Sequence, residues 1–192
     1  MKRELSAGLG TVLSVVAITI LATSTWSAAP TAEQAKAASD PWQPLRGLLG
    51  SWEGDAQGEP GSGKCEREYR LTLKDKFVQV TNKSTYPPQE KNPKGEIHED
   101  SGFISYDKAA QKLVMRQFHV EGFVNHYVLD SVSAEGRKLV FVTVAIENIP
   151  PGWRGRETYE LVSADEFVET FALAEPGKDF ATYSETRFRR KR

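Results

Sequence analysis

The chain has 192 residues, of which 39% are hydrophobic and 27% charged, and its formal net charge is −1. This length and composition predict one soluble domain with a short extension, and the near-zero charge gives no argument for nucleic acid as a partner. The single cysteine, Cys65, excludes an internal disulfide, so the hydrophobic core must stabilise the fold.

The first 29 residues have the pattern of a secretory signal peptide. Two basic residues open it, an apolar run from Leu9 to Ala22 follows, and small residues around Ser27 end it. The apolar run is short for a bilayer span, although an uncleaved membrane anchor is the alternative. We expect residues 1–29 to be a signal peptide and residues 30–40 a flexible leader. The protein is then secreted or periplasmic, with no stable membrane insertion after the signal is removed.

From residue 41 to residue 190 the chain is a series of short β-type runs separated by turn residues, with no long helical period. Ten consecutive antiparallel strands close most easily into an up-and-down β-barrel, because closure removes exposed strand edges. A two-sheet sandwich is the alternative. The predicted strands are 51–57, 64–74, 76–84, 96–106, 112–120, 123–131, 138–146, 154–163, 166–173 and 180–190.

The barrel domain opens with Leu45-Arg-Gly-Leu-Leu-Gly50-Ser-Trp52-Glu-Gly54. Gly50 allows the chain to bend between a short helical turn and the first strand. Trp52 has the area to close the floor of a barrel. We therefore predict a short N-terminal helical plug, with Trp52 at the base of the cavity.

The most informative stretch is 113–129, LVMRQFHVEGFVNHYVL, which reads as one hairpin folded about Glu121-Gly122. A two-residue loop pairs Arg116 with Tyr127, and paired residues share a face of the sheet. We predict that the more apolar face points inward and carries Arg116, Asn125 and Tyr127. The opposite face carries His119 and His126, which become candidate metal or haem ligands only if the hairpin is inverted.

Charged residues share faces with apolar residues on several other strands. Arg67 alternates with Tyr69 and Leu71, Glu157 with Tyr159, and Glu169 with Phe167. Burying such charges in a dry core is costly, whereas a barrel with a wet cavity tolerates them. Strand ends that reach solvent are the alternative for each of them. The pattern favours a cavity for a small molecule, and Trp153 in the proline-rich turn 147–154 is a candidate rim aromatic.

The order of these motifs resembles the calycin superfamily of lipocalin-like barrels, and most closely the nitrobindin-type haem-binding barrels. The start L-x-G-x-W-x-G matches Leu48 to Gly54, and a second match is the run from His98 to Ile104 with its Gly102-Phe103 pair. The resemblance implies haem, held by a histidine on the last strand, and chemistry on nitric oxide or peroxynitrite. At that position the chain has Tyr183, a residue that can also ligate ferric haem.

We therefore expect an exported β-barrel that binds a small, largely apolar or haem-like ligand, with Arg116 pairing any acidic group on it. The alternatives are a haem-dependent, nitrobindin-like enzyme of the peroxynitrite isomerase type and a ligand-free envelope interaction module. A catalytic role is the less expected one, since no phosphate loop or nucleophile elbow is present. The predicted ligand-binding residues are Trp52, Arg116, Asn125, Tyr127, Tyr159 and Tyr183.

Overall fold

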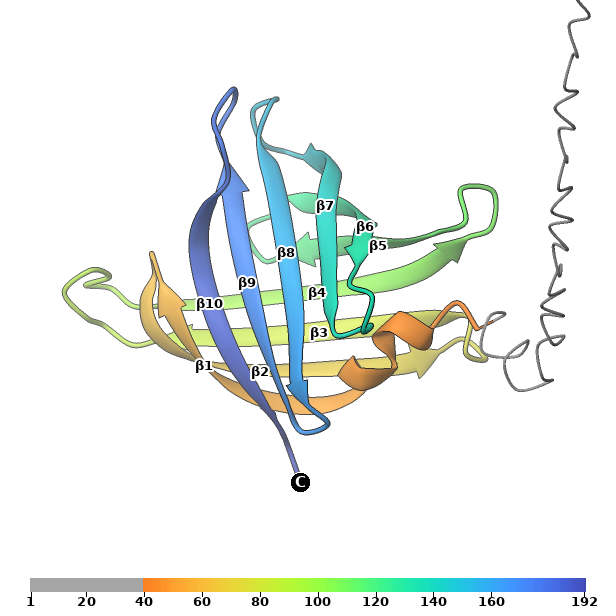
Figure 1. Ribbon diagram of the computed structural model, residues 1–192. Helices are drawn as coiled ribbons and strands as arrows, with labels where there is room; N and C mark the ends of the chain where they lie inside the picture. The colour runs from red at the N-terminus through yellow and green to blue at the C-terminus, as the bar shows by residue number, and fades with distance from the viewer. Residues whose placement is uncertain (1–39) are drawn as a thin grey trace, which may run out of the picture.

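The computed structural model describes residues 40–192, which form one closed antiparallel barrel preceded by a short 3-10 helix (Figure 1). The predicted signal peptide and nearly all of the predicted leader lie outside the described residues. The elements are η1 (Gln43–Leu48), β1 (Gly50–Gly58), β2 (Gly61–Thr72), β3 (Phe77–Tyr86), β4 (Glu96–Asp107), β5 (Lys112–His119), β6 (Val124–Val132), β7 (Lys138–Glu147), β8 (Arg154–Ser163), β9 (Glu166–Ala174) and β10 (Ala181–Arg190).

Each strand pairs with its neighbours in the chain, and β1 pairs with β10 to close the barrel. Trp52 lies opposite Arg190 and Gly58 opposite Ser184 across this closing ladder. The predicted ten-stranded up-and-down barrel is therefore confirmed, and the sandwich alternative is wrong. None of the helices in the described part of the chain is long and apolar enough to cross a membrane.

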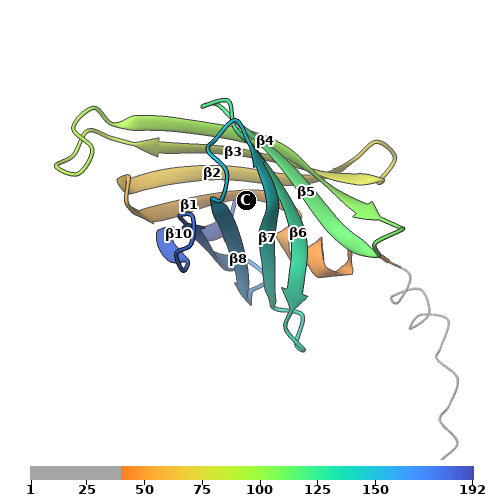
Figure 2. The same ribbon diagram turned by 90° about the horizontal axis from the view of Figure 1, so that it is seen from above.

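The strands of the closed barrel form two layers that run in crossing directions. In Figure 1, β2, β3 and β4 run across the view, while β7, β8 and β9 cross them steeply, and Figure 2 shows β2 to β5 lying over β7 and β8. Inward side chains of the two layers therefore face one another, as in other strongly twisted sheets.

One end of the interior is filled by aromatic side chains. Phe167 lies at the centre, with its ring edge-on to Trp52 at 4.7 Å and stacked on Phe188 at 4.8 Å between centroids. The 3-10 helix η1 adds Leu45 and Leu48 to the same buried cluster, and the Trp52 indole donates a hydrogen bond to the Leu48 carbonyl at 2.7 Å. A six-residue 3-10 helix thus stands where a helical plug was predicted, and closure of that end by the helix stays a prediction.

The β5–β6 hairpin differs from the predicted one by one residue of register. Its loop has three residues, because the His119 amide donates to the Phe123 carbonyl across it, and Gly122 adopts a φ of +88°. Arg116 consequently pairs with His126 and not with Tyr127. Since side chains alternate along a strand, this shift places the β5 side chains on the opposite face from the predicted one, while the β6 side chains keep theirs. Asn125 and Tyr127 point inward as predicted, but the predicted inward orientation of Arg116 is wrong and that residue is exposed.

Candidate functional site

The other end of the barrel holds a cavity of about 580 Å³. This volume is typical of sites for drug-sized molecules. Its outer wall is mainly apolar and comes from the β5–β6 and β7–β8 loops and from β3, β7 and β9. The apolar lining residues are Tyr86, Phe123, Ile146, Ile149, Pro150, Trp153, Phe171 and Leu173.

The inner wall of the cavity is polar and begins with an ion pair. Arg67 on β2 donates to Glu169 on β9 at 2.5 Å, and both side chains are only 8% exposed. The Arg67 Nε also donates to Asn82 on β3 at 3.1 Å, and its guanidinium lies over the Phe188 ring. Burial is the largest single effect and disfavours the charged guanidinium, but Glu169, together with Tyr69, Tyr159 and Asp100, outweighs it and raises the pKa of Arg67. The inward location of Arg67, Glu157 and Glu169 agrees with their alternation along the strands.

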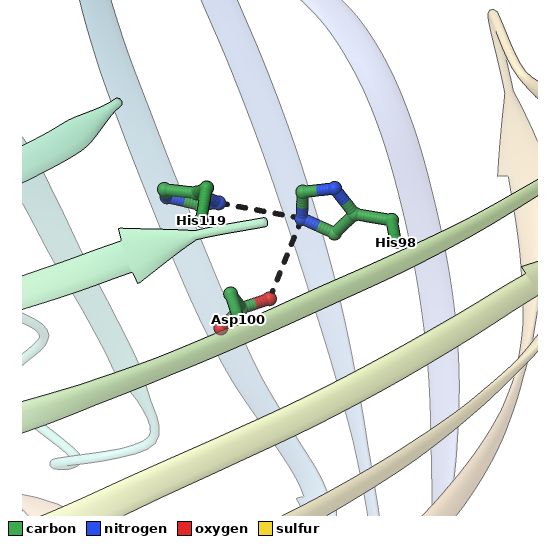
Figure 3. Close-up of side chains that lie close together, drawn as sticks. All are labelled: His98, Asp100 and His119. Carbon is green, nitrogen blue, oxygen red and sulfur yellow. Dashed lines mark hydrogen bonds and ion pairs between the residues drawn. The ribbon is translucent and has the colours of Figure 1, made fainter. Parts of the chain in front are cut away.

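Two histidines and an aspartate meet on the wall formed by β4 and β5 (Figure 3). The Nε2 of His98 lies 3.3 Å from the Nδ1 of His119 and 3.5 Å from the Oδ2 of Asp100. The pairing of Asp100 with His119 across the ladder brings these residues together. The imidazole of His119 is stacked on Phe123 at 4.0 Å, which fixes its plane.

Each member of this cluster has a further hydrogen-bond partner. Glu121 approaches the Nδ1 of His98 at 2.7 Å, and the Gln117 amide donates to the Oδ1 of Asp100 at 2.9 Å. The Asn125 amide lies 3.1 Å from the Nε2 of His119. The cluster is therefore held from all sides by residues of β4, β5, β6 and the β5–β6 loop.

The two histidines differ in charge. The hydrogen bond with Asp100, assisted by Glu121, raises the pKa of His98 to about 9, so its imidazole is protonated at neutral pH. Burial lowers the pKa of His119 to about 4, and its imidazole is neutral. Burial alone would raise the pKa of Asp100, but the His98 hydrogen bond and the Arg67 charge lower it.

Glu157 on β8 is a third buried acid in the cavity wall, after Glu169 and Asp100. Burial, together with the charge of Glu169, raises its pKa to about 8, so the side chain is mostly a neutral carboxylic acid at neutral pH. It accepts a hydrogen bond from the Tyr159 hydroxyl. A neutral acid in this position can donate a hydrogen bond as well as accept one.

Two acceptors in the cavity wall have no partner among the described residues. Gln117 and Asn125 face each other across the β5–β6 ladder and are 5% and 2% exposed. The Oε1 of Gln117 and the Oδ1 of Asn125 accept no hydrogen bond. Leaving a buried acceptor unsatisfied costs about 1–3 kcal/mol, so this wall is suited to a hydrogen-bond donor.

The structure brings some of the predicted site residues together and separates others. Asn125, Tyr127 and Tyr183 line the cavity, with Tyr183 at its rim on a bulge of β10. Trp52 and Tyr159 do not line the cavity. Trp52 lies in the filled end, and Tyr159 lies in the buried core, where its hydroxyl donates to the cavity residue Glu157.

The two histidines predicted as conditional metal ligands are on opposite faces. His119 lines the cavity, whereas His126 points outward and pairs with Glu147 at 2.5 Å. The prediction that both share the outer face is therefore wrong, because the β5–β6 pairing differs by one residue from the predicted one. Asp100 and three residues within hydrogen-bond or ion-pair reach of it were not predicted as site residues, although alternation from Val80 and Ile104 places three of these four inward. They are Asn82, His98, Asp100 and Gln117.

Comparison with known proteins shows a fold and no family. No protein-family model matches the chain, and no curated protein matches it. Among solved structures, Rv2717c from M. tuberculosis superposes with a TM-score of 0.61 at 18% identity, covering 79% of this chain and 98% of that one. The S-type phycobiliprotein lyase CPES from Guillardia theta superposes with a TM-score of 0.53 at 13% identity, covering 85% and 99%. These similarities are to the fold alone, a closed antiparallel β-barrel.

Proposed function

We propose that the barrel binds a small, neutral, largely apolar molecule that carries a hydrogen-bond donor. The observation that carries this proposal is the cavity of about 580 Å³ with an apolar mouth and two unpartnered acceptors, Gln117 Oε1 and Asn125 Oδ1, at its polar wall. The apolar body of such a ligand would pack against Trp153 and Phe171 near the mouth. Its donor would hydrogen-bond to the buried acceptors. A ligand without a donor would leave them unsatisfied and would therefore bind more weakly.

The charge of the lining argues against an acidic ligand. The exposed Arg116 lies outside the cavity, and the one lining arginine, Arg67, is already paired with Glu169. A ligand carboxylate would therefore meet five acidic side chains, of which Glu157 is neutral, against two cations, Arg67 and His98. The acidic side chains in the lining are Glu96, Asp100, Glu121, Glu157 and Glu169.

Haem, with nitrobindin-like chemistry, is the second candidate. It is favoured by His119, a neutral imidazole at the cavity, and by Tyr183 at the rim, since both residue types ligate haem iron. The donor set suits iron, but the acid-rich lining does not suit the two carboxylates of the porphyrin. We therefore derive no reaction step through haem. A filled interior would favour the third alternative, the ligand-free envelope module, and the cavity described above gives it no such support.

The proposal is tested with two fluorescent probes that share one skeleton. N-phenyl-1-naphthylamine is neutral and carries one N–H donor, and 8-anilinonaphthalene-1-sulfonate adds a sulfonate. We expect the neutral probe to bind in a 1:1 complex, at least about tenfold more tightly than the anionic one, which corresponds to about 1.4 kcal/mol. A parallel hemin titration should give no Soret shift that depends on His119 or Tyr183.

Matched variants locate the probe. Trp153→Ala should weaken binding of the neutral probe by about fivefold or more, because it removes aromatic surface from the mouth. Val144→Ala changes an outward side chain and should leave the affinity unchanged. Tighter binding of the anionic probe, or equal effects of both variants, would contradict the proposal.

We also propose that the protein is exported, which the order of basic, apolar and small residues in 1–29 supports. Expression of the full chain followed by cell fractionation and N-terminal sequencing tests this. A mature N-terminus near residue 30 in the secreted or periplasmic fraction is expected. Retention of the full chain in the cytoplasmic fraction would contradict export.

A further inference from the structure

We propose that His98, Asp100 and His119 form a binding site for a divalent transition metal of the Zn²⁺ class, with one coordination position open to the cavity. Two imidazoles and one carboxylate are a common set of protein ligands for Zn²⁺, and catalytic-type sites add a water or a ligand atom to three protein ligands. All three residues line the cavity, so a metal held between them would face its interior (Figure 3).

The spacing of the donor atoms fits a tetrahedral ion. With bonds of about 2.0–2.1 Å, adjacent ligand atoms of a tetrahedral centre lie roughly 3.3–3.4 Å apart. The Nε2 of His98 is 3.3 Å from the Nδ1 of His119 and 3.5 Å from the Oδ2 of Asp100. The three donor atoms all lie within 4.8 Å of one another, so small side-chain rotations complete the triangle.

The outer hydrogen bonds are those expected around metal ligands. Ligating histidines usually donate their second ring N–H to an acceptor, and ligating carboxylates are themselves hydrogen-bonded. Glu121 is in place to accept from the Nδ1 of His98, and Gln117 donates to the free oxygen of Asp100. The Asn125 amide lies beside the Nε2 of His119. Rotating that amide by half a turn exchanges its oxygen and nitrogen and places Oδ1 there to accept the N–H, while the Tyr127 hydroxyl can donate to the same oxygen.

The unpartnered acceptors are a second indication, that of Asn125 only with its amide rotated as above. The amides of Gln117 and Asn125 are more than nine-tenths buried, and both border the cluster. When the Nδ1 of His119 binds a metal, its ring proton is on Nε2. With the Asn125 amide rotated, this N–H donates to the Asn125 oxygen, which otherwise has no donor. A water on the open coordination position is a donor of the kind that the Gln117 oxygen lacks.

The rival explanation is a metal-free cluster in which His98 is an imidazolium held by two carboxylates. Isothermal titration calorimetry of the purified chain with Zn²⁺ distinguishes the two. One equivalent should bind with a dissociation constant of about 1 μM or tighter, and His119→Ala and Asp100→Asn should each weaken binding at least about 100-fold. The matched control is His126→Ala, which removes the outward-facing third histidine and should change nothing.

Two further measurements distinguish the loss of a metal ligand from misfolding of a variant. Co²⁺ should give the intense visible bands of a tetrahedral centre in the wild type, but not in Asp100→Asn, a nearly isosteric change. Gln117→Leu, which removes the hydrogen bond to Asp100 and the unpartnered Gln117 acceptor but no metal ligand, should weaken Zn²⁺ binding by about tenfold. Absence of stoichiometric Zn²⁺ binding, or equal loss in His126→Ala and His119→Ala, would overturn the inference. Binding of the neutral naphthylamine probe is measured separately, so the two proposals fail independently.

Discussion

Arg67 and Glu169 form an ion pair between strands 102 residues apart in the chain, with their nearest charged atoms 2.5 Å apart and both side chains almost completely buried. The pair joins the two layers of the barrel at the boundary between its filled end and its cavity. Asn82 and the Phe188 ring occupy two further sides of the guanidinium. A charge in this position is tolerated because its partner and its hydrogen bonds are fixed in advance.

Removing one partner of this pair should destabilise the barrel strongly. Glu169→Gln leaves the Arg67 charge buried without a counter-ion and should lower the free energy of unfolding by about 3–5 kcal/mol, measured by urea denaturation. The exposed pair of Lys138 with Glu160, at 3.8 Å, provides the control. Glu160→Gln should cost about 1 kcal/mol or less, and similar costs at both sites would contradict a structural role for the buried pair.

The stability of the protein should depend on pH through Glu157. Its folded-state pKa is raised from 4.5 to about 8, so its stabilising contribution is fully present below pH 4.5 and is lost as the pH rises through 8. Over this window the slope from one proton approaches about 1.4 kcal/mol per pH unit. Denaturation of the wild type and Glu157→Gln at several pH values measures it. The variant should show the smaller decline, and parallel curves would refute the assignment.

The outward location of Arg116 has a direct consequence for binding. Arg116→Ala should leave the affinity for the neutral naphthylamine probe unchanged, because the side chain lies on the outer face of β5. Asn125→Ala removes an acceptor from the cavity wall and should weaken binding by about fivefold or more. Fluorescence titration of both variants decides the point, and the reverse order of effects would restore the predicted inward orientation of Arg116.

The 3-10 helix η1 should be part of the cooperative fold. Leu48 is 1% exposed and belongs to the buried cluster around Trp52, so Leu48→Ala should cost about 2–5 kcal/mol in thermal or urea unfolding. Val144→Ala, at an outward position, should cost less than about 0.5 kcal/mol. A small cost at Leu48 would mean that the helix folds independently of the barrel.

The strand order and the barrel could be predicted because they depend on local signals. Turn residues such as Glu135-Gly136 separate runs with a clear period of two, and the ten predicted strands correspond to the ten observed. The inward location of Arg67, Glu157 and Glu169 followed from the same alternation. Local sequence pattern was therefore sufficient to predict the fold and part of the polar interior.

The register of the β5–β6 hairpin could not be derived in the same way. Glu121-Gly122 is compatible with a two-residue loop and with the observed three-residue loop that includes Val120, and the two differ by one position. The apolar outer residues Phe118 and Val120, 51% and 62% exposed, reinforced the wrong choice of face. Likewise, the approach of His98 to His119 depends on the β4–β5 register, which no local pattern specifies.

The most direct test of the central claim is to locate the bound neutral probe. In ¹H–¹⁵N correlation spectra of the labelled protein, titration with N-phenyl-1-naphthylamine should shift the amides of cavity residues such as Gln117, Asn125 and Gly155, while those around Trp52 and Phe188 at the filled end stay in place. Shifts confined to the outer face, around Phe118 and Val144, would show that the cavity is not the binding site and would contradict the account.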